Sequence, residues 1–548
     1  MSKQEIKVME EKCLLQAIDD LGKGSKLLWI IFIINFLISI LFGLNSMSYV
    51  FVAEIPEYWC YTPELIDWTT DQINNISMVD KCLKYDHNYT HLADLGFEEA
   101  TKYVNNFELM PSTVSCSMFM FDDSERSTIV NEWQLVCDNK LHRANTFLMY
   151  SLGMTCGSSF LGIYADKYGR KNSLIISIIL QIIAGPLSAL VPWFWAYLIL
   201  KFLTGISTGA MYSSGYTILS EIATSNRIKV FAGIIDITFS IGTFLLIGMA
   251  YFLQDWRQLQ IAISCFILPI IVLIWFIPES PRWLISQNRH DEAQKIIDKH
   301  HKSFVMTSTS NIESPTSEPR ISSVECNEKL EDRKGFFHRN FESLKILFTN
   351  SDLRKKTFIV DFSYYVTATG SYILVFSVDN FKSSRYLYMS IVAVNEVLGV
   401  LAISVILKFF TSRKSLIITY TVAFVLMITI STIPEENTNI IMGLALAGKF
   451  CFSASFTVNL VFLSELFPSN VRNTAFGTCL VMSQTGCMTA PYILDLLGNV
   501  AWWAPTTLCS VLSLMAGLFC FAIPQTKLNS GKDTHVDGEV TGSGHNTK

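Results

Sequence analysis

The chain alternates between hydrophilic segments and long apolar stretches that carry few charged residues. A helix needs about 20 apolar residues to cross a bilayer, and about twelve stretches reach this length. They lie near residues 27–50, 144–164, 173–193, 196–219, 229–251, 259–277, 357–378, 386–407, 415–433, 440–463, 474–493 and 500–523. Only 16% of the 548 residues are charged, against roughly a quarter in soluble domains. We therefore predict an all-α membrane protein.

Basic residues are concentrated in alternate loops, and this distribution orients the chain. The basic loops contain Lys167, Arg170 and Lys171, then Arg227 and Lys229, then Arg282 to Lys356, then Lys408, Arg413 and Lys414. By the positive-inside rule this side is cytosolic, together with the N-terminus (1–26) and the C-terminal tail (524–548). The first stretch is too long for a cleaved signal peptide, and it follows a charged segment. We expect a multi-pass protein of the plasma membrane.

Residues 53–142 form a hydrophilic loop after the first stretch, on the outer side by the same rule. The loop contains Cys60, Cys82, Cys116 and Cys137, an even number in an oxidising compartment, so we predict two disulfides of undetermined connectivity. It also contains two glycosylation acceptors, Asn75-Ile-Ser77 and Asn88-Tyr-Thr90. Acceptor sites and paired cysteines both support an external location.

A second hydrophilic segment, residues 278–356, is basic and therefore cytosolic, and it divides the stretches into two sets of six. We predict an N-terminal six-helix bundle over 27–277 and a C-terminal six-helix bundle over 357–523. Many secondary transporters consist of two such bundles with a binding site between them near the midplane of the membrane.

The turn between the second and third stretches reads Gly162-Ile-Tyr-Ala-Asp166-Lys-Tyr-Gly169-Arg170-Lys171. Glycines allow close helix approach and a tight reversal, and the charged residues form a cluster at the bilayer surface. This spacing resembles the loop between the second and third helices of the major facilitator superfamily. The matching turn after the eighth stretch, residues 408–414, keeps a basic pair but lacks the aspartate and the glycines.

Further segments resemble one branch of that superfamily, the organic cation, carnitine and organic anion transporters. They are Pro278-Glu-Ser-Pro-Arg-Trp-Leu284, Glu465-Leu-Phe-Pro-Ser-Asn-Val-Arg472-Asn, and the loop ending Ser127-Thr-Ile-Val-Asn-Glu-Trp-Gln-Leu-Val-Cys137. Sugar porters share the first segment but lack the long loop, and they are the nearest alternative. The resemblance implies a major facilitator fold with a large extracellular loop after helix 1.

Charged residues at the cytosolic helix ends are predicted to act as a gate. Helix C-terminal dipoles and nearby carboxylates can hold the arginines there, and such ion pairs can break during alternating access. The predicted gating residues are Gly162, Asp166, Gly169, Arg170, Lys171, Glu221, Glu279, Arg282, Glu465 and Arg472.

Ionisable residues inside the stretches are candidates for a substrate site, because burying one unpaired in hydrocarbon costs about 3 kcal/mol or more. Asp236 and Glu396 lie deepest, and a positively charged substrate would offset their desolvation. Asp361 lies near the cytosolic end of its stretch. We interpret Lys201 and Lys449 as structural or coupling residues, since each stands where the superfamily or family resemblance places an arginine.

Tyrosines at comparable depth could present aromatic faces to an ammonium group. We predict substrate contacts for Tyr212, Tyr216, Tyr364 and Tyr365. The family resemblance places Tyr212 where cation transporters carry a substrate-contacting tryptophan, and it matches Tyr364 to another such aromatic. The position that is Asp in cation transporters and Arg in anion transporters matches Gln484, which is neutral.

The leading hypothesis is a transporter of small organic cations or amine-bearing zwitterions, driven by a gradient. One alternative is an organic anion or carnitine-like exchanger, and another is a non-transporting membrane sensor with the same fold. We find no nucleotide-binding loop, metal-spaced His/Cys set or nucleophile motif, so we expect no enzyme activity, cofactor, metal or ATP. A net charge of −5 is too small to indicate nucleic acid, so the expected partners are a small organic ion and membrane lipid.

Overall fold

The computed structural model describes residue 14 and residues 16–105, 112–122, 126–309, 345–380 and 384–523. The expected C-terminal tail and the middle of the expected linker lie outside these residues. Within the described part, ten helices are long and apolar enough to cross a membrane. The chain is therefore an all-α membrane protein.

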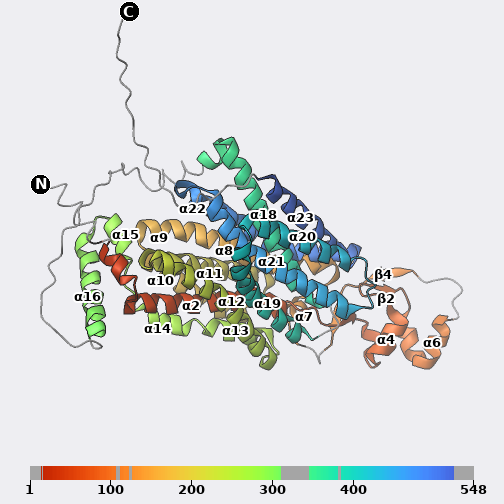
Figure 1. Cartoon of the computed structure of the whole chain (residues 1–548). Helices are drawn as coiled ribbons and strands as arrows, with labels where there is room; N and C mark the ends of the chain where they lie inside the picture. Colours follow the sequence, from red (N-terminus) through yellow and green to blue (C-terminus); the bar gives the residue numbers. More distant parts are fainter. Residues whose placement is uncertain are drawn as a thin grey trace, which may run out of the picture.

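The first set of spans occupies the region before the linker, shown from red to green in Figure 1. Its helices are α2 (Lys26–Met47), α3 (Tyr49–Val52), α8 (Lys140–Cys156), the π-helix η3 (Gly157–Leu161), α9 (Gly162–Tyr168), α10 (Arg170–Leu190), α11 (Phe194–Ile222), α12 (Ser225–Phe252), α13 (Trp256–Cys265) and α14 (Leu268–Ile274). The expected span 259–277 is broken between α13 and α14, next to Pro269, which lacks the backbone N–H that a continuous helix requires.

The second set of spans follows the linker and is drawn in cyan and blue. Its helices are α18 (Ser351–Phe376), η4 (Ser377–Asn380), α19 (Arg385–Phe409), α20 (Ser412–Ile430), α21 (Thr438–Leu466), α22 (Ser469–Val500) and α23 (Ala504–Ala522). Two helices, the short α15 (Pro281–Ser286) and the 20-residue α16 (His290–Thr309), lie in the linker region.

The two sets meet mainly where α8 packs on α22 and α12 packs on α19. The helices α8 and α22 correspond to the expected spans 144–164 and 474–493, yet neither is among the ten described helices that are long and apolar enough to cross a membrane. The first turn of α8 carries Lys140, His142 and Arg143, and α22 is rich in serine, threonine and asparagine. Such residues are tolerated in a membrane where they face protein instead of lipid.

Helices α8 and α11 cross at very short range. A Cβ atom at Gly205 would lie 2.1 Å from the backbone oxygen of Tyr150, and one at Gly209 would lie 2.3 Å from that of Met154. Only glycine fits at such a crossing, because any side chain would separate the two backbones. The backbones of α8 and α11 are therefore in direct contact at these glycines.

The outer loop folds into a small subdomain with a two-stranded and a three-stranded antiparallel sheet. Its elements are β1 (Tyr58–Cys60), η1 (Pro63–Leu65), α4 (Thr70–Ser77), β2 (Met78–Asp80), β3 (Leu83–Tyr85), α5 (Tyr89–Leu95), α6 (Phe97–Asn105), β4 (Thr113–Ser115), β5 (Phe119–Phe121), α7 (Ile129–Trp133) and η2 (Cys137–Asn139). Figure 1 shows α4 and α6 at one end of the helical body, with α15 and α16 at the other end.

The four predicted loop cysteines are paired as Cys60–Cys116 and Cys82–Cys137. Both acceptor asparagines are exposed on this subdomain. Asn75 lies within α4, whereas the side chain of Asn88 caps the N-terminus of α5 by accepting a hydrogen bond from the backbone of His91.

Candidate functional site

Asp236 lies in the first third of the membrane-spanning part of α12, Val230–Phe252. Many protein atoms lie around the carboxylate, and its side chain keeps an exposed surface. Its charge acts on the phenols of Tyr212 and Tyr216 on α11 and of Tyr364 on α18. Both sets of spans therefore contribute side chains to the surroundings of Asp236.

The tyrosines near Asp236 present both aromatic and polar groups. Tyr364 is only 1% exposed, and its hydroxyl has no hydrogen-bond partner among the described residues. The ring of Tyr212 contacts that of Phe42 at a centroid distance of 5.5 Å. A carboxylate beside aromatic rings can hold an ammonium group by charge attraction and cation–π contact.

Glu396, the other predicted counter-charge, is already neutralised. Its carboxylate lies 3.1 Å from the Lys449 ammonium, and the two side chains are 16% and 4% exposed. Ser240 of α12 donates a hydrogen bond to the second carboxylate oxygen at 3.3 Å, so this buried pair contacts the first set of spans. Lys449, interpreted from the sequence as structural, is thus the partner of a predicted site residue.

The remaining predicted substrate residues lie at the junction of α18 and α22. The Tyr365 hydroxyl lies 3.3 Å from Thr489 Oγ1 on α22. Gln484 is half-buried on the same helix. Neither residue forms a hydrogen bond with Asp236 in the described part of the chain, so the structure brings the predicted set together only in part.

A network of ion pairs joins the two sets of spans at the end of the helices that lies next to the disulfide-bonded loop, the face predicted to be external. Arg143 of α8 contacts Asp379 at 2.9 Å and Asp495 of α22 at 3.0 Å. Arg385, at the start of α19, contacts Asp379 at 2.7 Å and Glu54 at 2.9 Å. Burial raises the pKa of the Glu54 carboxyl above its ordinary value, against the opposing effect of Arg385.

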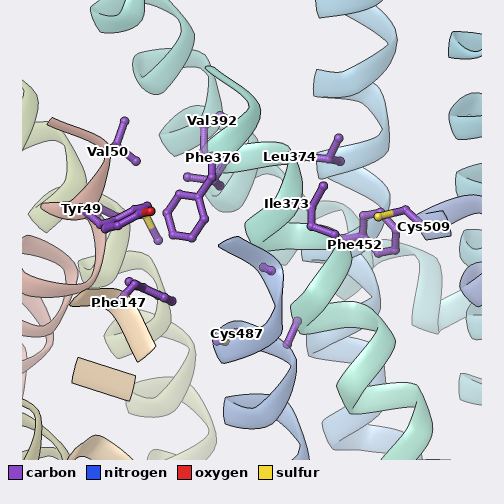
Figure 2. Close-up of a cluster of buried hydrophobic side chains, with 14 of the residues drawn as sticks. Tyr49, Val50, Phe147, Ile373, Leu374, Phe376, Val392, Phe452, Cys487 and Cys509 are labelled. Atoms are coloured by element: carbon purple, nitrogen blue, oxygen red, sulfur yellow. The ribbon is translucent and has the colours of Figure 1, made fainter. Parts of the chain in front are cut away.

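Aromatic rings close the space beside this network. Figure 2 shows Tyr49, Phe147 and Phe376 turned toward one another, and their ring centroids lie 4.7 to 5.4 Å apart. These rings belong to α3, α8 and α18. The hydroxyls of Ser46 and Tyr372 also meet across the two sets at 2.9 Å. The ion pairs, the rings and this hydrogen bond together close the outer side.

The predicted cytosolic cluster assembles around Arg170. Arg170 contacts Asp166 at 2.8 Å and Glu221 at 3.2 Å. Glu279 caps α10 by accepting hydrogen bonds from the backbone N–H groups of Arg170 and Lys171 at 2.9 and 3.1 Å. All these elements belong to the first set of spans or to the segment that follows it.

Gly169 fits this cluster for two reasons. Its φ of +111° is unfavourable for other residues, and a Cβ there would lie 2.3 Å from a Glu279 carboxylate oxygen. Gly162 has no such constraint, since a Cβ added to it would meet no atom within 4 Å. The two glycines of the motif therefore differ in role.

The other predicted gating residues have separate partners. Arg282 contacts Asp19 at 2.6 Å. In the second half, Glu465 accepts a hydrogen bond from Ser412, and Arg472 donates one to the Phe467 carbonyl at 3.2 Å. Within the described ranges, no ion pair links the two halves at the cytosolic face, whereas Arg143 links them at the outer face.

The sequence interpretation overlooked the outer network. Arg143 and Arg385 lie at the beginnings of spans, and the sequence alone predicts no role for them or for Asp495. The available signal was the presence of opposite charges at the outer ends of spans in different halves. Such charges can pair across the interface.

The arrangement described above is that of an alternating-access membrane transporter. Two helical sets pack together, a solvent-reached carboxylate lies between them, and ion pairs close one face. Comparisons with known proteins agree. The family model described as "Sugar (and other) transporter" matches residues 95–536. The chain therefore belongs to this family, within the major facilitator superfamily, and its curated relatives are organic cation and carnitine transporters.

Individual relatives match over most of their length. The chain is 30% identical to the "Organic cation transporter protein" of Drosophila melanogaster over 513 residues, covering 92% of this chain and 90% of the relative. It is 26% identical to the mouse "Organic cation/carnitine transporter 2", with coverage of 88% and 86%. The xylose transporter XylE from E. coli, 14% identical, shares the fold with a TM-score of 0.59, covering 91% of this chain and all of that chain.

Proposed function

We propose that this chain carries small organic cations or amine-bearing zwitterions across the plasma membrane, with both termini in the cytosol. Asp236 is the observation that carries the proposal. It is a solvent-reached carboxylate inside a span, it has no ion-pair partner among the described residues, and it lies near three tyrosines from two helices. A substrate ammonium would supply the missing charge and would use the ring faces.

The charged residues of this region favour a cation over an anion. Lys449 is the cation that an anionic substrate would need in the second half, and Glu396 already neutralises it at 3.1 Å. Asp236 has no such partner in the described part of the chain. A bound cation therefore restores neutrality, whereas a bound anion would add to the uncompensated charge. The names of the relatives, which mention organic cations and carnitine, agree with this choice.

A zwitterion with a carboxylate is the second candidate, because Lys449 lies in the same half as Tyr364 and could exchange Glu396 for a substrate carboxylate. A carnitine-like substrate would have no net charge. Depolarising the membrane should slow the uptake of a net cation and leave a zwitterion unaffected, since moving one charge across 100 mV changes the free energy by about 2.3 kcal/mol.

The proposed transport movement follows from the different ion pairs at the two faces. We propose that residues 27–277 and 357–523 move as two bodies, and that the outer ion pairs of Arg143 and Arg385 break when the site opens outward. The cytosolic cluster around Arg170 would then approach the second half, closing the inner face. The driving force would be a gradient, and the substrate would leave chemically unchanged.

The test is uptake of a radiolabelled quaternary ammonium ion into cells that express the chain. Asp236→Asn removes the charge at constant size, and we expect uptake to fall by about 10- to 100-fold, because the removed ion pair is partly buried. Asp236→Glu should retain measurable uptake. The matched control is the double variant Glu396→Gln with Lys449→Met, which removes a neutral pair. Normal uptake by Asp236→Asn at equal surface expression would refute the proposal.

A further inference from the structure

A small, partly enclosed cavity lies in the outer half of the first set of spans, apart from the surroundings of Asp236. Its volume is about 20 Å³, which is room for roughly one particle the size of a water molecule. Its walls come from α2, α3, α8 and α11. The polar residues among its lining are Asn45, Ser48, Tyr49, Thr146, Tyr150, Tyr197 and Lys201.

Lys201 brings a buried ammonium group to this cavity. The residue is 6% exposed, and its Nζ donates a hydrogen bond to Gln260 Oε1 at 2.8 Å. The Tyr197 ring lies 5.4 Å from the same nitrogen. No carboxylate among the described residues forms an ion pair with it. Lys449 provides the contrast, because it is equally buried and contacts Glu396.

The neighbouring outer network does not supply the missing negative charge. It contains as many arginines as carboxylates: Arg126, Arg143 and Arg385 against Glu54, Asp379 and Asp495. These charges pair with one another, so the network leaves no unpaired carboxylate to offset Lys201. A charged Lys201 therefore remains uncompensated, which is costly at a buried site in a membrane.

Hydrogen-bond donors with unused capacity lie around the cavity. The hydroxyls of Ser48 and Thr146 already donate to backbone carbonyls. Tyr49 is 8% exposed, and its hydroxyl has no hydrogen-bond partner in the described part of the chain. The Asn45 amide donates one N–H to the Leu41 carbonyl, which leaves its second N–H available. Lys201 has two further N–H groups.

We propose that this cavity binds a small monovalent inorganic anion of the chloride class. Lys201 supplies the charge, and Tyr49 and Asn45 supply neutral donors. The small volume of the cavity excludes larger organic anions, and the absence of a second ammonium or guanidinium on the cavity lining disfavours divalent anions. This site is independent of the Asp236 site, since their residues do not overlap.

The test uses the purified full-length protein in a gluconate buffer titrated with chloride at constant ionic strength. We expect chloride to raise the thermal unfolding midpoint in a saturable manner, by about 2 °C or more, because a ligand that binds only the folded form stabilises it. Lys201→Met should lose this response, and Lys201→Arg should keep it. The control, Glu396→Gln with Lys449→Met, should respond like the parent protein.

A second variant covers the case in which Lys201→Met does not fold. Tyr49→Phe retains the ring and removes only the hydroxyl, and it should weaken chloride binding by about tenfold. Bromide soaked into crystals of the unmodified protein should give an anomalous peak beside Lys201. The proposal is overturned if chloride leaves the unfolding midpoint unchanged, if folded Lys201→Met responds fully, or if bromide is absent from the cavity.

Discussion

The outer and cytosolic faces use charged residues in different ways. At the outer face, Arg143 lies between two acidic residues that follow or form part of second-half helices, Asp379 and Asp495. At the cytosolic face, Arg170 contacts Asp166 and Glu221 within the first half. The comparison teaches that an ion pair can stabilise one conformation of the transporter only where it joins the two sets of spans. An ion pair within one set stabilises the structure of that set alone.

The cytosolic ends of the two halves also differ from each other. Glu221 ends α11 and contacts an arginine, whereas Glu465 ends α21 and accepts a hydrogen bond from Ser412. The second-half turn lacks the aspartate and glycines of the first, which agrees with this simpler contact. The charged latch is thus a property of the first half alone among the described residues.

The largest expected effect comes from breaking the outer network at its centre. Arg143→Gln leaves two carboxylates without their shared partner, and such removal typically costs about 3–5 kcal/mol. We expect uptake to fall more than about tenfold, with increased labelling of S46C by an external maleimide as the outer side opens. Arg257→Gln is the control, because Arg257 pairs with Glu132 at the same face but within the first half. Equal effects from both variants would contradict the comparison.

An intermediate effect is expected at the cytosolic turn. Gly169→Ala places a side chain at φ +111° and against the Glu279 carboxylate, which should destabilise this turn by about 1–3 kcal/mol. Gly162→Ala is the matched control, since its Cβ would meet no neighbour within 4 Å. Thermal unfolding of the purified variants measures the difference. If the two variants unfold at the same temperature, Gly169 does not hold the cluster as described.

The smallest expected effect concerns pH at the outer face. Burial raises the pKa of Glu54 in the closed form, and opening should return it toward its ordinary value. The closed form therefore binds a proton more tightly at Glu54. Lowering the external pH through the pKa of this carboxyl should favour the closed form and slow outward opening, so that the uptake rate falls by less than about threefold. Uptake by Glu54→Gln should lose this pH dependence. A parent protein whose uptake accelerates in acid would contradict the sign.

Local sequence patterns predicted the fold well because membrane spans and charged turns are local features. Apolar length marked the spans, and the charged motif correctly brought Asp166 and Arg170 together. Pairings between distant segments were not visible. Glu396 and Lys449 lie on different helices, and their contact depends on how α19 and α21 pack. The proximity of Asp236 to Tyr364 likewise depends on how the two halves pack. The sequence gives only the order of their spans along the chain.

The tight crossing of α8 and α11 has a mechanical consequence. Arg143 is carried by the first of these helices, and Tyr212 and Tyr216 are carried by the second. Because carbonyl groups at Tyr150 and Met154 nest against Gly205 and Gly209, neither helix can slide without its neighbour. Any tilt that pulls the arginine from its acidic partners must also shift the tyrosines around the central carboxylate. Opening of the outer face and rearrangement of the proposed substrate site are therefore coupled movements.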